Sequence, residues 1–467
     1  MAQVTFPLTS HLMNRRHIPA TYAELLRVEQ ATPEEAARTQ FQRLRQTLTY
    51  AAQWVPWYQR RFKEIGLEPG DIKSLDDLKR IPPLTRADVI DHHREMVDSR
   101  QQEAIDAALQ SRRDAGNPIP LARFRRHRLV RNNSSGSTGA PTVFFEDGSI
   151  SALNWALEQR HKHWFGVEPG SREARMVRLS TSYVANSLGN RWRRLLWHQL
   201  ILPGMNLRDA DYELCRRQIE DYQPCALWGI TGSLTGLADY LQRSGRPLSF
   251  RPAVVAGWAA PVYDHEQALL EAVFRCPISN IYSAREVGHI ALKCPHENFH
   301  INQEHLIVET QPAEDSTRGA GSGEVLVTTL VPTPMPFIRY RMGDIARIVP
   351  SRCPCGRTLP VLEEFAGRTG EIFTTRDGRM ISPNFWGRIF MARDIPGAVK
   401  RFQVIYTRDQ KIVVKIVRGE SFNAGTAEHL SRAMHDNFAP TTAVLFKYVD
   451  EIKPTVSGKY LMVQKEE

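Results

Sequence analysis

Apolar residues recur at helical spacing near the start of the chain. Phe41, Leu44 and Leu48 lie on one face of a helix with a repeat of about 3.6 residues. The preceding Thr32-Pro33-Glu34-Glu35 combines a capping threonine, a proline suited to a first turn and a glutamate that can cap in return. A second capping signature, Thr85-Arg86-Ala87-Asp88, predicts a further helix. We therefore expect roughly the first hundred residues to be mainly helical.

Strand-like and helical stretches alternate through the middle of the chain, from about residue 128 to about residue 365. The runs Ala253–Ala256 and Glu324–Val327 have the apolar character of strands, whereas Asp264–Phe274 has the pattern of a helix. This alternation is typical of an α/β core, so we predict an α/β fold for the large part of the chain.

The pattern changes near Gly370. Short strands, one helix and a final strand are expected beyond it, over Phe402–Tyr406, Lys411–Val417, Ala424–Asn437 and Ala443–Val449. These elements predict a small α+β domain. We therefore expect two domains, residues 1–369 and residues 370–467.

Composition narrows the class of protein. The 467-residue chain has 42% hydrophobic and 24% charged residues, which is ordinary for a globular protein of two or three domains. No apolar run approaches the roughly 18 residues needed to cross a bilayer. The polar Asn14-Arg15-Arg16-His17 falls where a secretion signal would be apolar. We expect a cytoplasmic protein with no membrane partner.

The net charge of +10 raises the possibility of a nucleic-acid partner, because basic chains bind polyanions. Arginines gather within residues 123–131 and 191–194, but no recognisable DNA- or RNA-binding motif accompanies them. They are interpreted either as solvated faces or, for the first cluster, as a source of positive potential for a polyphosphate substrate. A nucleic-acid-binding protein is retained as the rival class, and no specific nucleic acid is expected.

Small hydroxyl residues and glycines are concentrated in Ser134-Ser135-Gly136-Ser137-Thr138-Gly139. Backbone amides and hydroxyls in such a loop can donate to phosphate oxygens, and glycine lets the backbone approach closely. A flexible linker is the alternative, but Phe144-Phe145 follows at once and an apolar strand precedes. Ala140 stands where a P-loop would have its lysine, which excludes a Walker-type kinase or ATPase.

Five segments in order resemble the motifs of adenylate-forming acyl ligases. They are the loop just described, Tyr282-Ser283-Ala284-Arg285-Glu286, Arg339–Asp344, Gly367-Arg368 and Ser457-Gly458-Lys459. The run Met335–Asp344 is similar to the Met-Pro-apolar-Ile-Arg-Tyr-Arg-containing segment of the phenylacetate-CoA ligase family and its capsular-polysaccharide-type branch. The resemblance covers essentially the whole chain. It implies the acyl-adenylate-forming fold, with residues 1–369 as the ATP- and acid-binding domain and residues 370–467 as a small mobile domain.

The resemblance also implies a role for each matching residue. Ser134, Ser135, Gly136, Ser137, Thr138 and Gly139 would hold the β- and γ-phosphates of ATP, and Glu286 would help to bind Mg²⁺. Tyr282 would lie against adenine, followed in its motif by Ser283 and Arg285, with Gly257, Trp258 and Ala259 along the adenine edge. Asp344 would bind the ribose hydroxyls, Arg368 the ribose and phosphate side, and Lys459 the substrate carboxylate and α-phosphate. Lys459 and Glu286 are the predicted catalytic residues.

Each assignment has an ordinary structural alternative. Taken singly, Asp344 suits a turn, Glu286 a helix start and Lys459 a solvated tail. Their occurrence in the order of the family's motifs favours the functional assignment. Ser283 departs from the family pattern because glycine is usual there. A side chain at this position is expected to narrow the acyl pocket.

The cysteines suggest a metal. Cys353-Pro-Cys355 is a close pair, and Cys294 is followed by His296 and His300. Three thiols and one imidazole are a suitable closed donor set for structural zinc. Sequence alone does not show that the two segments meet, and reduced buried cysteines with exposed histidines are the alternative. The resemblance implies a metal site here, and the predicted zinc ligands are Cys294, His300, Cys353 and Cys355.

The expected function is a two-step ligation. ATP and Mg²⁺ would activate an aryl or cyclic carboxylic acid as acyl-AMP with release of pyrophosphate, and CoA would then accept the acyl group. The segment Arg376–Pro383 lacks the usual Arg-Gly approach to pantetheine, so an amide-forming ligase that uses an amino acid or another amine is the alternative. A relative that uses the fold for interaction without catalysis is a further one. Expected partners are the small acid and its acceptor, and a homodimer is one assembly left open.

Overall fold

The structure of the chain is a computed structural model. It describes residues 18–101, 103–106, 129–133, 142–179, 190, 194–205, 207–312, 322–331, 333–350, 353–368, 373–374, 380–381, 383–390, 395, 397–409, 411–438, 443–453 and 461–466. The predicted phosphate loop Ser134–Gly139 and Lys459 lie outside the described residues. The side chain of Arg368 is likewise not described.

Helices dominate the first hundred residues, as the sequence predicts. They are α2 (Ile18–Val28), α3 (Pro33–Trp54), α4 (Pro56–Glu64) and α5 (Arg86–His92), with the short 3-10 helices η1 (Pro69–Asp71), η2 (Asp76–Arg80) and η3 (Ser99–Gln101). The Thr32 hydroxyl accepts a hydrogen bond from the Glu35 amide at 3.2 Å, and the Glu35 carboxylate accepts one from the Thr32 amide at 3.0 Å. These reciprocal bonds satisfy amides that the first helical turn leaves open. The predicted capping box of α3 is therefore confirmed.

A large mixed sheet forms the centre of the molecule. In the described part of the chain its order is β10-β11-β12-β13-β9-β8-β7-β6-β5-β3-β4. Its strands are β3 (Glu173–Val177), β4 (Gln199–Pro203), β5 (Ala226–Ile230), β6 (Val254–Trp258), β7 (Ile278–Ala284), β8 (Gly288–Lys293), β9 (Phe299–Ile301), β10 (Leu306–Gln311), β11 (Ser322–Thr329), β12 (Tyr340–Val349) and β13 (Val361–Arg368). A separate hairpin pairs β1 (Val130–Asn133) with β2 (Val143–Glu146).

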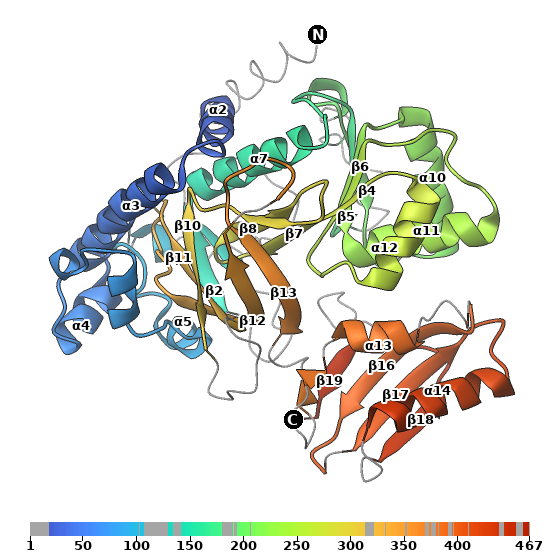
Figure 1. Cartoon of the computed structure of the whole chain (residues 1–467). Helices are drawn as coiled ribbons and strands as arrows, with labels where there is room; N and C mark the ends of the chain where they lie inside the picture. The colour runs from blue at the N-terminus through green and yellow to red at the C-terminus, as the bar shows by residue number, and fades with distance from the viewer. Residues whose placement is uncertain are drawn as a thin grey trace.

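The sheet changes character at β7. From β4 to β7 the strands run parallel, and from β7 to β10 they run antiparallel. Helices α10 (Asp209–Tyr222), α11 (Thr231–Ser244) and α12 (Asp264–Phe274) lie beside the parallel half, and α3 and α4 lie beside β10 and β11 (Figure 1). Helices alternating with parallel strands are what an α/β core requires, so the predicted fold class is confirmed.

Helix α7 (Gly148–His163) carries an unusually polar interior. Its residues Gln159, Arg160, His161 and Lys162 are all buried. Arg160 forms a 2.7 Å ion pair with Glu304, and Lys162 forms a 2.6 Å pair with Glu173. Buried charges are costly unless they are paired. The helix is therefore held in place by these charged partners as well as by its apolar residues Leu153 and Leu157, which pack against α2.

The end of the chain forms a C-terminal unit, whose described residues comprise β14 to β19 and the helices α13 and α14. Its elements are β14 (Phe373–Thr374), β15 (Met380–Ile381), α13 (Pro383–Phe390), β16 (Val399–Tyr406), β17 (Ile412–Arg418), α14 (Ala424–Asn437), β18 (Val444–Tyr448) and β19 (Val463–Lys465). Its own core contains Trp386, Phe390 and Phe402. The predicted final strand is β18, but β19 follows it and pairs parallel with β16, so that detail of the prediction was wrong.

Candidate functional site

Two of the predicted nucleotide-binding residues meet directly. The Tyr282 hydroxyl on β7 donates a hydrogen bond of 2.7 Å to the Asp344 carboxylate on β12. Three strands lie between β7 and β12 in the sheet order. In a flat sheet that separation would be about 19 Å, because neighbouring strands are about 4.8 Å apart. The antiparallel half must therefore curve strongly, and this curvature forms the Tyr282–Asp344 pair.

Arg368 lies beside the same carboxylate along the sheet. Asp344 and Arg368 are backbone partners in the β12–β13 ladder. The sequence assigns both residues to the ribose side of a nucleotide, and the strand pairing brings their backbones together. An ionised carboxylate accepts hydrogen bonds and donates none, so Asp344 suits the two hydroxyl donors of a ribose.

The turn after β6 holds the second group of predicted residues. Ala259 has a φ of 71°, a conformation uncommon for a residue with a side chain. The Thr231 hydroxyl donates to the carbonyls of Trp258 and Ala260 at 3.2 and 2.9 Å, and these bonds pin the turn. A Cβ on Gly257 would lie 2.6 Å from the Thr231 hydroxyl oxygen. Glycine is therefore required by the close approach of Thr231, a residue the sequence did not indicate.

The turn between β7 and β8 carries Arg285 and the predicted magnesium residue Glu286. The Arg285 guanidinium donates a 2.7 Å hydrogen bond to the carbonyl of Asn133. Asn133 ends β1 and immediately precedes the predicted phosphate loop in sequence. This bond joins the end of β1 to the turn that carries Glu286. Ser283 lies at the end of β7 and pairs with His289 across the ladder.

Arg175 and Glu158 form a charged pair beside Trp258, and no motif in the sequence indicated it. The Arg175 guanidinium lies over two indole rings, 5.1 Å from the centre of Trp155 and 5.4 Å from that of Trp258. It also pairs with the Glu158 carboxylate at 2.5 Å. Burial opposes the ionisation of Glu158, but the charge of Arg175, the hydrogen bond with His289 and the charge of Lys162 together outweigh it and lower the pKa to about 2. Arg175 therefore remains a fixed cation against Trp258. Such a contact joins separate strands and helices and leaves no mark in a single sequence.

The second predicted site is the Cys/His cluster, which consists of Cys294, His300, Cys353 and Cys355. One ligand atom from each of the four residues lies within 4.8 Å of all the others. The sulfurs of Cys294 and Cys353 are 3.6 Å apart, and the Cys355 sulfur is 3.2 Å from His300 Nε2. His300 rather than His296 joins the cluster, as predicted. The structure therefore brings together two segments whose meeting the sequence could not show.

Neighbouring groups orient the cluster. His300 Nδ1 donates to the Leu359 carbonyl at 3.1 Å, which leaves Nε2 directed at the cluster with a free electron pair. Burial lowers the pKa of His300 to about 4, so the ring is neutral near neutral pH. The Asn298 amide donates to the Cys353 sulfur at 3.2 Å. A neutral imidazole and hydrogen-bonded sulfurs are the arrangement in which a tetrahedral metal site is commonly held.

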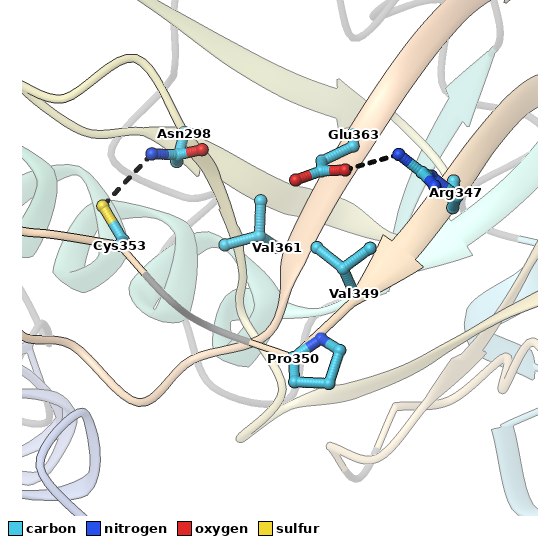
Figure 2. Close-up of a pocket in the computed structure, with 7 residues that line it drawn as sticks. All are labelled: Asn298, Arg347, Val349, Pro350, Cys353, Val361 and Glu363. Atoms are coloured by element: carbon cyan, nitrogen blue, oxygen red, sulfur yellow. Dashed lines mark hydrogen bonds and ion pairs between the residues drawn. The ribbon is translucent and has the colours of Figure 1, made fainter.

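A cavity of about 360 Å³ adjoins the cluster on the Cys353 side. Figure 2 shows its lining, with Asn298 directed at Cys353 on one side and the Arg347–Glu363 ion pair, 2.9 Å long, on the other. The valine and proline side chains between them are apolar. Cys353 thus borders an open space, whereas Cys294 is buried.

The sequence comparisons find phenylacetate-coenzyme A ligases and CapK proteins. A sequence profile described as the CapK C-terminal domain matches residues 373–466. A phenylacetate-coenzyme A ligase from Thermus thermophilus is 26% identical over 81% of this chain and 80% of its own length. Protein CapK from Staphylococcus aureus is 20% identical over 96% of this chain and 92% of its own length.

Solved structures share the fold. 2-Hydroxyisobutyryl-CoA ligase in the postadenylation state, in complex with 2-HIB-AMP, superposes with a TM-score of 0.71 at 19% identity and covers 94% of this chain and 91% of its own. The same ligase in the thioesterification state superposes with a TM-score of 0.57, over 94% of this chain and 92% of its own. Among the described residues, no helix combines the length and apolar composition needed to cross a bilayer.

Proposed function

Because this chain is a phenylacetate-CoA ligase-like protein of the CapK type, and therefore an AMP-forming acid ligase as its sequence predicts, we propose that it converts an aryl or cyclic carboxylic acid into its CoA thioester. The ligases it resembles use ATP, Mg²⁺ and CoA. The aryl or cyclic class of acid is supported by the similarity to phenylacetate-coenzyme A ligases. The small acid and CoA are its proposed partners.

The proposal rests chiefly on the 2.7 Å bond between Tyr282 and Asp344. This bond unites two motifs that lie far apart in the sequence. We assign Asp344 to the ribose hydroxyls, Tyr282 to the adenine face and Gly257, Trp258 and Ala259 to its edge. Arg368 is assigned to the ribose and phosphate side. The Tyr282 hydroxyl donates to one carboxylate oxygen and so fixes the orientation of the Asp344 carboxylate.

The phosphate side is assigned to the loop Ser134–Gly139, Arg285 and Glu286. The bond between Arg285 and the Asn133 carbonyl supports this grouping because Asn133 adjoins the loop in sequence. Mg²⁺ supplies charge that offsets the phosphate oxygens when it is bound, and Glu286 would hold it. The carboxylate of the acid attacks the α-phosphorus, and pyrophosphate leaves. Lys459 would place its cation between the two anions as they approach.

We also propose that the Cys/His cluster holds one structural zinc ion. Three sulfurs and a neutral imidazole nitrogen within 4.8 Å of one another fit a closed tetrahedral site. With four protein ligands there is no position for a substrate, so the ion would join the β8–β9 hairpin to the loop after β12 rather than take part in the reaction. Metal analysis of the purified protein should give about one zinc per chain.

The division into residues 1–369 and residues 370–467 is likewise proposed. It is supported by the separate four-stranded sheet and core of the C-terminal unit. In this proposal the first part binds ATP and the acid, and the second carries Lys459.

Mass spectrometry of reaction products tests the proposed acceptor. The protein would be incubated with ATP, Mg²⁺ and a panel of aryl and cyclic acids, together with CoA, an amino-acid mixture or neither. An acyl-CoA formed only with CoA is the expected product. An acylated amino acid would replace CoA by an amine acceptor, and acyl-AMP without transfer to either would point to a different acceptor.

A further inference from the structure

The loop that follows β12 supplies two residues of the Cys/His cluster and then contacts the end of helix α2. The Thr358 hydroxyl donates to the carbonyl of Ala31 at 2.7 Å and to that of Glu29 at 3.2 Å. The Arg357 guanidinium lies 3.6 Å from the Glu29 carboxylate. The segment that ends α2 is therefore attached to the same loop that carries two of the proposed zinc ligands.

The histidine of the cluster reaches the same carboxylate through one indole ring. The His300 imidazole meets the Trp164 ring edge to face, with centroids 5.8 Å apart. The Trp164 indole nitrogen donates to the Glu29 carboxylate at 2.9 Å, and the Arg357 guanidinium lies 4.4 Å from the centre of the Trp164 ring. Glu29 and His300 are both buried. Close-packed groups transmit displacements to one another, so a change at the cluster should be felt at the end of α2.

Cys353 is accessible from solvent through the cavity of about 360 Å³ that it lines. On the opposite side of this cavity, the Arg347 and Glu363 side chains are 35% and 40% exposed, so the space opens to solvent (Figure 2). Hydrogen peroxide is little larger than water and fits such a space. Access and thiolate character together decide which cysteines are oxidised. A zinc-bound Cys353 thiolate would meet both conditions.

A second sulfur stands close to Cys353. The sulfur of the buried Cys294 is 3.6 Å away. A disulfide bond is about 2.05 Å long, so an approach of about 1.5 Å would bring the two sulfurs to bonding distance. Joining them would remove two of the four donor atoms of the cluster. Oxidation of this pair is therefore incompatible with a closed zinc site.

We propose that Cys353 is a site of reversible oxidation, at which a hydroperoxide joins Cys353 to Cys294 as a disulfide, expels the zinc ion and loosens helix α2. The inference rests on the zinc ion of the proposed function and adds a reaction of its ligands that is separate from ligation of the acid. Reduction of the disulfide by a dithiol and rebinding of zinc would restore the first state.

The oxidation proceeds in two steps. The Cys353 thiolate attacks one peroxide oxygen, the O–O bond breaks, and a sulfenic acid and hydroxide form. The Cys294 thiolate then attacks the sulfenic sulfur and displaces a second hydroxide, which completes the disulfide. The two sulfurs give up two electrons, and the two hydroxides take two protons from solvent to become water. The zinc ion keeps only His300 and Cys355 as protein ligands and dissociates.

Zinc release tests the oxidation in the wild-type protein. Hydrogen peroxide would be added in the presence of a colorimetric zinc chelator, and about one zinc per chain should appear. Mass spectrometry of an unreduced digest should show the Cys294 peptide linked to the Cys353 peptide, and dithiothreitol with added zinc should restore the metal. Zinc that stays bound while peroxide oxidises the exposed Cys225 would overturn the proposal. A disulfide that omits Cys294 or Cys353 would overturn it equally.

A narrower cavity tests the route to Cys353 without touching any ligand. Val349 lines the cavity and is half-buried, so Val349→Phe should fill part of the space. This variant should keep its zinc, and peroxide should release that zinc more slowly by at least about threefold, because oxidation depends on access. Val308→Phe, at a half-buried valine of β10 that does not line the cavity, is the matched control. Equal release rates in the two variants would contradict entry through the cavity.

Hydrogen exchange tests the link to helix α2. Peptides covering residues 18–31 should exchange about tenfold faster after oxidation, which corresponds to a factor of ten in local opening, and should regain protection after reduction with zinc. Thr358→Val removes the hydroxyl that holds the end of α2 but no zinc ligand, so it should accelerate the same peptides at full zinc content. Thr39→Val, at a hydroxyl bonded within its own helix, is the matched control. Unchanged exchange of residues 18–31 in both cases would overturn the link.

These readouts do not depend on ligase activity. A wild-type protein that binds no zinc would overturn the zinc assignment and the release step, while the disulfide map would still decide whether Cys294 and Cys353 are the oxidised pair. A protein that releases zinc as expected but forms no acyl-CoA would count against the proposed ligation alone.

Discussion

The Cys/His cluster and the Tyr282–Asp344 pair are both assembled from segments far apart in the sequence, but they differ in what completes them. The cluster brings four donor atoms within 4.8 Å of one another, a set that a single cation can satisfy. The Tyr282–Asp344 pair joins a phenol to a carboxylate at 2.7 Å, and an ionised carboxylate is a group that accepts hydrogen bonds. The first region is a set of donors that one ion can complete, whereas the second is proposed to bind a nucleotide.

The cluster should therefore stabilise the fold, and the Tyr282–Asp344 pair should serve the reaction. A closed metal site contributes to folding because its ligands are preformed in the folded chain. An oriented carboxylate contributes to binding of a ligand that donates hydrogen bonds. Changes in the first region should therefore act on metal content and stability, and changes in the second on the reaction.

The largest effect is expected at Lys459. Lys459→Ala removes the cation proposed to stabilise the approaching anions, so acyl-adenylate formation should fall by roughly 10² to 10³. Pyrophosphate release with a responsive acid measures it. Zinc content and melting temperature should remain at their wild-type values. A fall of less than about threefold would remove Lys459 from the proposed chemistry.

Cys353→Ser should change the zinc content and the melting temperature more than it changes acyl-adenylate formation. Loss of one of four ligands should reduce zinc from about one per chain to a small fraction and lower the melting temperature by several degrees. Metal analysis and calorimetry of the same sample measure both. Cys225→Ser, at an exposed cysteine outside the cluster, is the matched control. A variant of Cys353 that keeps its metal would contradict the ligand assignment.

Acid should weaken the packing of helix α7, in which His161 is fully buried. Burial lowers the pKa of His161 from 6.5 to about 3. Between these values the unfolded chain binds a proton that the folded chain excludes. This group therefore reduces stability as pH falls below about 6.5, by about 1.4 kcal/mol per pH unit. Denaturant unfolding of wild type and His161→Gln between pH 7 and pH 5 should show a smaller pH slope in the variant, and equal slopes would refute the assignment.

The smallest effect is expected for Tyr282→Phe, which removes the hydroxyl donor but keeps the ring. Loss of one hydrogen bond to a carboxylate costs roughly 1.5 to 3 kcal/mol when the partner stays buried, and less here because Asp344 is only partly buried. The KM for ATP should rise by about three- to tenfold with little change in kcat. Asp344→Ala, in which the acceptor itself is lost, should raise the KM further. An unchanged KM in Tyr282→Phe would mean that the hydroxyl does not orient the carboxylate.

Local signals predicted the elements best. The capping residues of α3 and α5 act within one turn, so Thr32 and Thr85 were sufficient to locate both helix starts. Helices α12 and α14 have the bounds that their patterns indicate. Strand β19 was missed because its three residues, Val463–Lys465, carry too little pattern and owe their structure to pairing with β16.

The candidate sites were predictable as residues but not as arrangements. Cys294 and Cys353 meet because β9 pairs with both β8 and β13, a long-range outcome that spacing does not encode. The contacts of Arg175 with Trp258 and of Thr231 with the turn after β6 are likewise formed between distant elements. The sequence-based roles of the phosphate loop and Lys459 stay predictions, since these residues lie outside the described ones.

Transfer of a carboxylate oxygen from the acid to AMP tests whether the acid attacks the α-phosphorus of ATP. Phenylacetate labelled with ¹⁸O in its carboxylate would be incubated with the protein, ATP, Mg²⁺ and CoA, and the nucleotide products analysed by mass spectrometry. If the acid attacks the α-phosphorus, one labelled oxygen remains on AMP when CoA displaces it from the acyl carbon. AMP carrying one ¹⁸O, formed together with phenylacetyl-CoA, is the expected result. Thioester formed alongside unlabelled AMP, or alongside ADP and labelled phosphate, would contradict it.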